Sequence, residues 1–147
     1  MSFAKIYTRG LLGLHAPLIE VEVHVSSGMP SLTIVGLPEA AVRESKDRVR
    51  SAILNSGFQF PTKRLTINLA PADLPKDGSR LDLPIALGIL VASGQLPENC
   101  TDDLEFIGEL ALDGQLRPVT GILSIAIACQ HDQHQLMLPG PNAQEAC

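Results

Sequence analysis

Apolar and polar residues alternate with a two-residue period along the first part of the chain. The alternation is clearest from 19 to 25, where every second residue is isoleucine or valine. This period is that of a strand with one face in the core and the other in solvent. Shorter stretches at 3–8 and 31–35 predict two more strands. We expect the three strands to form an antiparallel meander with one exposed face.

Apolar residues then recur at the spacing of a helix, from 38 to about 56. Pro38 and Gly57 delimit this helix, because proline is favoured in a first turn and glycine just past the end. A short strand is predicted at 64–69. The next helix is strongly apolar and starts near Asp82, whose carboxylate is expected to accept hydrogen bonds from the free N–H groups of the first turn.

The last third of the chain predicts a hairpin, a helix and a strand. Residues 105–112 and 115–119 flank Asp113-Gly114, a dipeptide that supplies the positive φ angles of a tight two-residue hairpin turn. A helix is predicted at 121–130 and a final strand at 135–138. Because helices alternate with strands, we expect βαβ units beside the N-terminal meander, in an α/β (α+β) domain with a mixed sheet.

The length and composition suit one globular domain that spans residues 1–147. Hydrophobic residues make up 45% of the chain and charged residues 18%, which favours an ordered core over a disordered segment. Asn142 is suited to capping a helix, but only five residues follow it. We therefore expect this domain to be cut from the front of a longer protein.

A reducing, cytoplasmic location is expected from the cysteines and the N-terminus. The first ten residues lack the charged-then-apolar pattern of a signal peptide. The longest apolar run, at 83–94, is shorter than the roughly 20 residues that cross a bilayer, so it predicts a buried helix. The cysteines are odd in number and widely spaced, unlike a secreted disulfide framework. They are Cys100, Cys129 and Cys147.

Charge is spread unevenly, although the net charge is only −5. Residues 43–80 contain eight lysines and arginines and four acidic residues. From residue 81 onward there are one arginine and nine acidic residues. Such polarity suits a charged partner such as DNA, or subunits that stack head to tail. The candidate phosphate-binding residues are Arg43, Lys46, Arg48, Arg50, Lys63, Arg64, Lys76 and Arg80. Aromatic residues make up only 3% of the chain, so we expect contacts to phosphates rather than stacked bases.

Catalytic and metal chemistry is weakly indicated. Ser79 and Lys76 share a glycine-containing loop and could form a serine–lysine pair, although the residues from Pro75 to Ser79 favour a turn. The sequence contains no phosphate-binding motif of the P-loop type, so we expect no ATP hydrolysis by this route. The spacing of Cys129, His131 and His134 matches no common zinc site, and we expect no metal.

Two segments resemble the proteolytic domain of the Lon proteases. They are Asp73-Leu-Pro-Lys-Asp-Gly-Ser-Arg80, followed by an apolar helix, and Gly108-Glu-Leu-Ala-Leu-Asp-Gly-Gln-Leu-Arg-Pro-Val-Thr-Gly121. The segments 3–7 and 35–45 are similar to the ComM/YifB family of magnesium-chelatase-like AAA+ ATPases. This resemblance implies a Lon-like domain ahead of an AAA+ motor that binds ATP and Mg²⁺, with no cofactor in the domain itself. It further implies a hexameric ring and a role in DNA branch migration during natural transformation.

The Lon-like motifs also test whether protease chemistry is retained. Alignment with them places Arg80 at the position of the nucleophilic serine and Leu123 at that of the catalytic lysine, with Ser79 one residue early. Leucine cannot accept the serine proton. The resemblance therefore predicts a non-catalytic domain that contributes DNA contact, ring assembly or both. The alternatives are a protein-interaction module without DNA binding and a residual serine-dependent peptidase.

Overall fold

The computed structural model describes residues 2–74, 76 and 78–146. Pro75, Asp77 and Cys147, which belong to the loop and cysteines discussed above, lie outside the described residues. In chain order the elements are β1 (Phe3–Arg9), β2 (Leu18–Ser26), β3 (Ser31–Val35), α1 (Ala40–Arg43), α2 (Ser45–Asn55), β4 (Arg64–Ala70), α3 (Asp82–Ala92), β5 (Leu104–Phe106), β6 (Glu109–Leu110), β7 (Leu116–Arg117), α4 (Ile122–His131), β8 (Gln135–Met137), the 3-10 helix η1 (Gly140–Asn142) and α5 (Ala143–Ala146).

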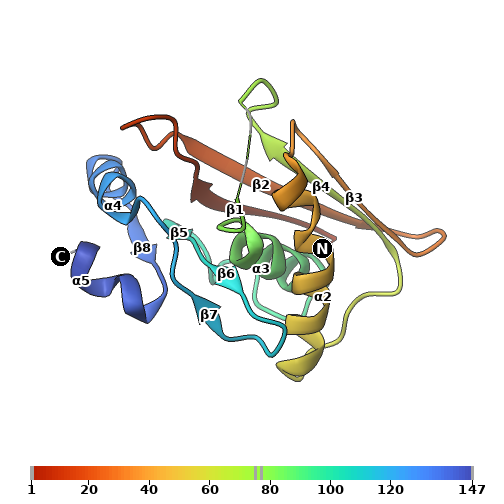
Figure 1. The fold of residues 1–147 in the computed structure, drawn as a ribbon. Helices are drawn as coiled ribbons and strands as arrows, with labels where there is room; N and C mark the ends of the chain where they lie inside the picture. The colour runs from red at the N-terminus through yellow and green to blue at the C-terminus, as the bar shows by residue number, and fades with distance from the viewer. Residues whose placement is uncertain (1, 75, 77, 147) are drawn as a thin grey trace.

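A mixed sheet confirms the predicted α/β class. Its strand order is β3-β4-β2-β1-β5-β8, with β2 antiparallel to both β1 and β4 and the remaining pairs parallel. The apolar helix α3 packs on β1 and β2, and α2 packs against α3 (Figure 1). The main core lies between these layers, where alternate residues of β2 are buried. A smaller cluster joins Ile107 to α4.

The predicted meander is wrong in its third strand. β3 does not lie beside β2, because β4 inserts between them and pairs with β3 in the parallel direction, Ser31 with Arg64 through Val35 with Asn68. The alternation of apolar and polar residues indicates which face of β3 is buried, but it does not indicate which strand pairs with β3.

The helix predicted from 38 to 56 is two helices that meet at Glu44. Pro38 precedes the first of them and forms a β-bridge with Lys76. In this bridge Lys76 N–H donates to the carbonyl of Leu37, and Glu39 N–H donates to the carbonyl of Lys76. The backbone around Pro38 is therefore extended rather than helical, because it pairs with the loop before α3.

Two details of the last third also differ from expectation. The β6–β7 turn holds three residues between Ala111 and Gln115, whose backbones are joined by a hydrogen bond, and only Gly114 of the Asp113-Gly114 pair has a positive φ. Asn142 does not cap a helix with its side chain. Its Oδ1 accepts a hydrogen bond from Val119 N–H, and its Nδ2 donates to the carbonyl of the same residue.

Candidate functional site

A groove of about 420 Å³ brings together three of the eight candidate phosphate-binding residues. Lys46 and Arg50 lie one turn apart on α2 and therefore share a face, while Val49, on the adjoining face, is buried in the core. Lys63 reaches the groove from the segment that leads into β4. All three cations are exposed, and Asp47 supplies the one carboxylate among the described residues that line the groove.

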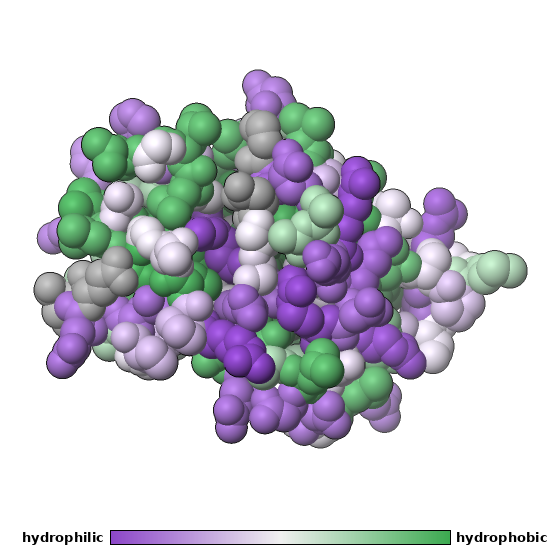
Figure 2. Space-filling view, viewed as in Figure 1, coloured by the Kyte–Doolittle hydropathy of each residue, from purple (hydrophilic) through white to green (hydrophobic). Residues whose placement is uncertain are grey.

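The groove also contains an aromatic side chain. The guanidinium carbon of Arg50 lies 5.4 Å from the centre of the Phe60 ring, within the range of a cation–π contact. Phe60 is half-buried and packs against the main core, so it anchors the arginine to the fold. Polar residues gather over α2 on this side of the molecule (Figure 2).

A second hollow, of about 780 Å³, adjoins the first. Phe58 and Phe60 both line it, beside the end of α3. The low aromatic content predicts contacts to phosphates rather than stacked bases, whereas the structure places two aromatic side chains beside Lys63. The signal was present in the sequence, because both phenylalanines lie between Arg50 and Lys63. The hollows share five lining residues, namely Leu54, Phe60, Pro61, Thr62 and Lys63.

The other five candidate residues do not line this groove. Arg43 on α1 and Arg64 at the start of β4 are exposed. Arg80 donates hydrogen bonds to the backbone carbonyl and the hydroxyl of Thr120. Arg48 is half-buried and bound to Asp82. The basic charge of the sequence therefore divides into exposed cations and cations that hold the fold together.

Asp82 is the centre of one such structural contact and not a helix cap. Its buried carboxylate accepts hydrogen bonds from Ser45 Oγ at 2.5 Å, Arg48 Nε at 2.7 Å and the Leu110 backbone N–H at 3.0 Å. The hydrogen bond to Asp82 raises the pKa of Arg48 above its usual value. These bonds join α2, α3 and β6, so the guanidinium of Arg48 is committed to the interior.

Lys76 is buried, with only 2% of its surface exposed. Its ammonium donates to the carbonyl oxygens of Gly36, at 2.6 Å, and Pro71. Burial lowers the pKa of Lys76 below its usual value. In this position the ammonium ties the loop before α3 to the end of β3, and it is not presented to solvent as a phosphate contact would be.

The Lon-like positions are occupied by side chains with other partners. Ser79 Oγ donates a hydrogen bond to Glu109, whereas the ammonium of Lys76 is held by backbone carbonyls. Leu123, at the position of the catalytic lysine, is 53% exposed on α4. Ser79 and Lys76 therefore do not form the serine–lysine pair that their shared loop suggested.

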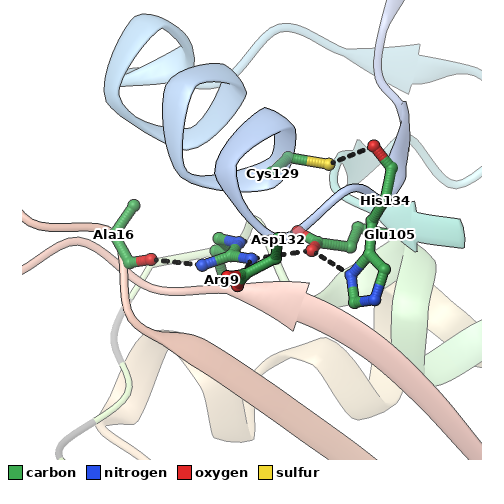
Figure 3. Close-up of polar contacts among 6 residues, drawn as sticks. All are labelled: Arg9, Ala16, Glu105, Cys129, Asp132 and His134. Carbon is green, nitrogen blue, oxygen red and sulfur yellow. Dashed lines mark hydrogen bonds and ion pairs between the residues drawn. The ribbon is translucent and has the colours of Figure 1, made fainter. Parts of the chain in front are cut away.

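Sequence reasoning missed a buried ionic cluster at the opposite end of the sheet (Figure 3). Arg9 binds Glu105 through two hydrogen bonds of 2.7 and 2.8 Å, Asp132 at 2.5 Å and the carbonyl of Ala16 at 3.0 Å. His134 Nδ1 lies 2.7 Å from Glu105 Oε2, the same oxygen that accepts a hydrogen bond from Arg9 Nη2. Burial opposes the charge of Arg9, but the two carboxylates outweigh it and raise its pKa.

This cluster accounts for residues first considered as metal ligands. The ring of His134 faces Glu105, and the Cys129 thiol donates to the backbone carbonyl of His134. Within the described residues, no group of three histidine, cysteine or acidic side chains is arranged to hold a metal ion. The described helices also include none that is long and apolar enough to cross a membrane.

We expect Cys129 to resist thiol reagents while the protein is folded. Burial raises its pKa to about 11, so little of the reactive thiolate exists near neutral pH. In a Cys147→Ser background, an aromatic disulfide reagent followed by peptide mass mapping should modify the exposed Cys100 and leave Cys129 intact until denaturant is added. Equal rates at both thiols in the folded protein would contradict this assignment.

Comparison with known proteins finds one family and several close relatives. Residues 21–142 match the family described as subunit ChlI of Mg-chelatase. The chain is 53% identical over 146 residues to "Competence protein ComM" of Haemophilus influenzae, and 53% identical over 145 residues to "Uncharacterized protein YifB" of Escherichia coli. Each match covers 99% of this chain but only 29% of the relative.

A more distant match is to "Lon protease" of Chloroflexus aurantiacus. It is 30% identical over 118 residues, which are 75% of this chain and 14% of that protein. The chain thus spans less than a third of the length of the ComM and YifB relatives, and a smaller share of the Lon protease.

Proposed function

Because the chain belongs to the family of ChlI, the Mg-chelatase subunit, we propose that it is the non-catalytic N-terminal domain of a longer AAA+ ATPase and that its basic groove contacts DNA. The longer protein would act in the cytoplasm in DNA recombination during natural transformation, as a hexameric ring. Its motor domain would bind ATP and Mg²⁺, and this domain would bind neither.

The gathering of Lys46, Arg50 and Lys63 along one groove carries the proposal. Exposed cations that lie along a groove can follow a phosphate backbone, because each one replaces counterions condensed on the nucleic acid. The similarity to a competence protein supports DNA as the polyanion. The non-catalytic assignment is supported by Leu123, whose side chain cannot act as a base.

The test is the salt dependence of DNA binding. We expect a fluorescein-labelled branched DNA to bind the protein saturably, as measured by fluorescence anisotropy, and to bind more weakly as salt rises. Replacing Lys46, Arg50 and Lys63 together with alanine should lower the slope of log affinity against log salt by about 3, since each phosphate contact contributes about 0.9.

Lys5 and Arg117 provide the matched control, because both are exposed cations outside the groove. The variant Lys5→Ala with Arg117→Ala should keep the salt slope of the unaltered protein. The proposal fails if no DNA binds at low salt, or if the control variant lowers the slope as much as the groove variant does.

A second candidate function, an interaction module for ring assembly, is favoured by an exposed apolar patch. The patch combines Leu12 and Leu14, 58% and 89% exposed, with Leu123 and Ile127, 53% and 60% exposed. Figure 2 shows hydrophobic residues gathered over α4 and the β1–β2 connection. Clusters of exposed apolar residues often mark protein interfaces.

If this patch joins copies of the chain, the protein should self-associate in a concentration-dependent way that survives high salt. Multi-angle light scattering should then show oligomers of the unaltered protein, and the variant Leu14→Ser with Ile127→Ser should be monomeric. A strictly monomeric unaltered protein at high concentration, at both low and high salt, would remove this candidate.

A further inference from the structure

The groove is lined by apolar side chains that phosphate binding does not require. Phosphates are bound by cations and N–H groups, yet the shared part of the two hollows is formed by Leu54, Phe60 and Pro61 beside Lys63. An apolar surface gains nothing from a phosphate, but it does gain from the flat face of a nucleobase. This observation rests on the proposed function and concerns which form of nucleic acid the same groove accepts.

The Arg50–Phe60 pair has the arrangement of a stacking platform. Arginine guanidinium planes and aromatic rings both stack on bases, and here one is held 5.4 Å from the centre of the other. Arg50 is exposed, while Phe60 is half-buried and packs against the core. The core therefore holds the pair through Phe60, and solvent reaches it through Arg50. Lys46 and Lys63 line the same groove and can neutralise the phosphates on either side of a stacked base.

The size of the hollows favours an unpaired strand. Their volumes, about 420 and 780 Å³, lie within the range of about 300–1,000 Å³ typical of small-molecule pockets. In a duplex the bases are paired and stacked on each other, so only phosphates would reach the rim of such a hollow. A single strand can turn its bases toward an aromatic surface while its phosphates meet the cations.

We propose that the groove between α2 and residues 58–63 binds single-stranded nucleic acid, with one base stacked on the Arg50–Phe60 pair and the neighbouring phosphates bound by Lys46 and Lys63. The second hollow, lined by Phe58 and Phe60, takes the next base along the strand. Stacking of this kind does not depend on which base is present, so the site recognises an unpaired strand whatever its sequence.

The test compares three labelled probes of equal length on the unaltered protein: oligothymidylate, an abasic strand with the same phosphates, and a duplex. We expect oligothymidylate to bind about tenfold more tightly than the abasic strand, because stacking is lost with the bases. Phe60→Leu should remove this difference and leave the affinity for the abasic strand unchanged, whereas Phe60→Tyr should keep it. A 2-aminopurine placed within the oligothymidylate should be quenched on binding to the unaltered protein and not to Phe60→Leu.

The outcomes separate this proposal from the function on which it rests. Equal binding of oligothymidylate and the abasic strand, with both lost in the variant of Lys46, Arg50 and Lys63, would overturn stacking and keep phosphate contact. Tighter binding of the duplex than of oligothymidylate would also overturn it. Failure of all three probes to bind would overturn both proposals. The probe comparison needs no substitution, so the result stands even if Phe60→Leu fails to fold.

Discussion

Replacing Arg9 with methionine should lower the free energy of unfolding by about 3–5 kcal/mol, the usual cost of removing one partner from a buried ion pair. Arg9 donates two hydrogen bonds to the Glu105 carboxylate, which has no solvent exposure. Without the guanidinium, this carboxylate keeps the ring of His134, 2.7 Å away, as a neighbour. Urea unfolding followed by circular dichroism measures the change.

The matched control for Arg9 is Arg117, which lies 3.7 Å from Glu109 and is 61% exposed. Surface ion pairs of this kind contribute about 0–1 kcal/mol, so Arg117→Met should leave the urea midpoint almost unchanged. A loss of similar size in the two variants would show that burial of the Arg9–Glu105 pair does not determine its contribution.

The second large effect is expected at Gly36, where β3 ends against β4. Its φ is +105°, and a Cβ atom built there would lie 2.1 Å from the backbone carbonyl oxygen of Leu69. Gly36→Ala therefore combines backbone strain with a steric clash that no side-chain rotation relieves. Each contributes about 1–3 kcal/mol, so we expect the free energy of unfolding to fall by about 2–6 kcal/mol.

Gly57 separates these two causes. It also has a positive φ, +88°, but nothing lies within 4 Å of a Cβ built there. Gly57→Ala should therefore lose only the strain, about 1–3 kcal/mol. Urea denaturation of both variants gives the difference. If Gly36→Ala were no more destabilising than Gly57→Ala, the close approach to Leu69 would not constrain this position.

The strands and helices were largely predictable because their signals are local. The bounds of β3 follow from the alternation between Ser31 and Val35, and the start of α3 follows from the apolar run after Asp82. The pairing of β3 with β4 was not predictable, because it depends on residues about thirty positions later and on β2 already having another neighbour. Local periodicity predicts elements better than it predicts their partners.

The candidate site was predictable in part. The concentration of cations in the middle of the chain indicated Lys46, Arg50 and Lys63 as well as Arg48 and Lys76, which the fold uses internally. The sequence could not separate the two kinds, because burial of a charge depends on its partner. Arg48 binds Asp82, which lies 34 positions away in the sequence, and Lys76 binds the carbonyl of Gly36, 40 positions away.

The insertion of β4 between β2 and β3 has a consequence for how the chain folds during synthesis. The β1–β2 hairpin is local and can form early, but β3 must wait for β4, and β1 gains its second neighbour only when β5 appears. The Arg9–Glu105 pair closes a loop of 96 residues. Non-local pairing of this kind slows folding, because chain entropy is lost before contacts compensate for it. A nascent chain therefore exposes unpaired strand edges until β5 and then β8 have been synthesised.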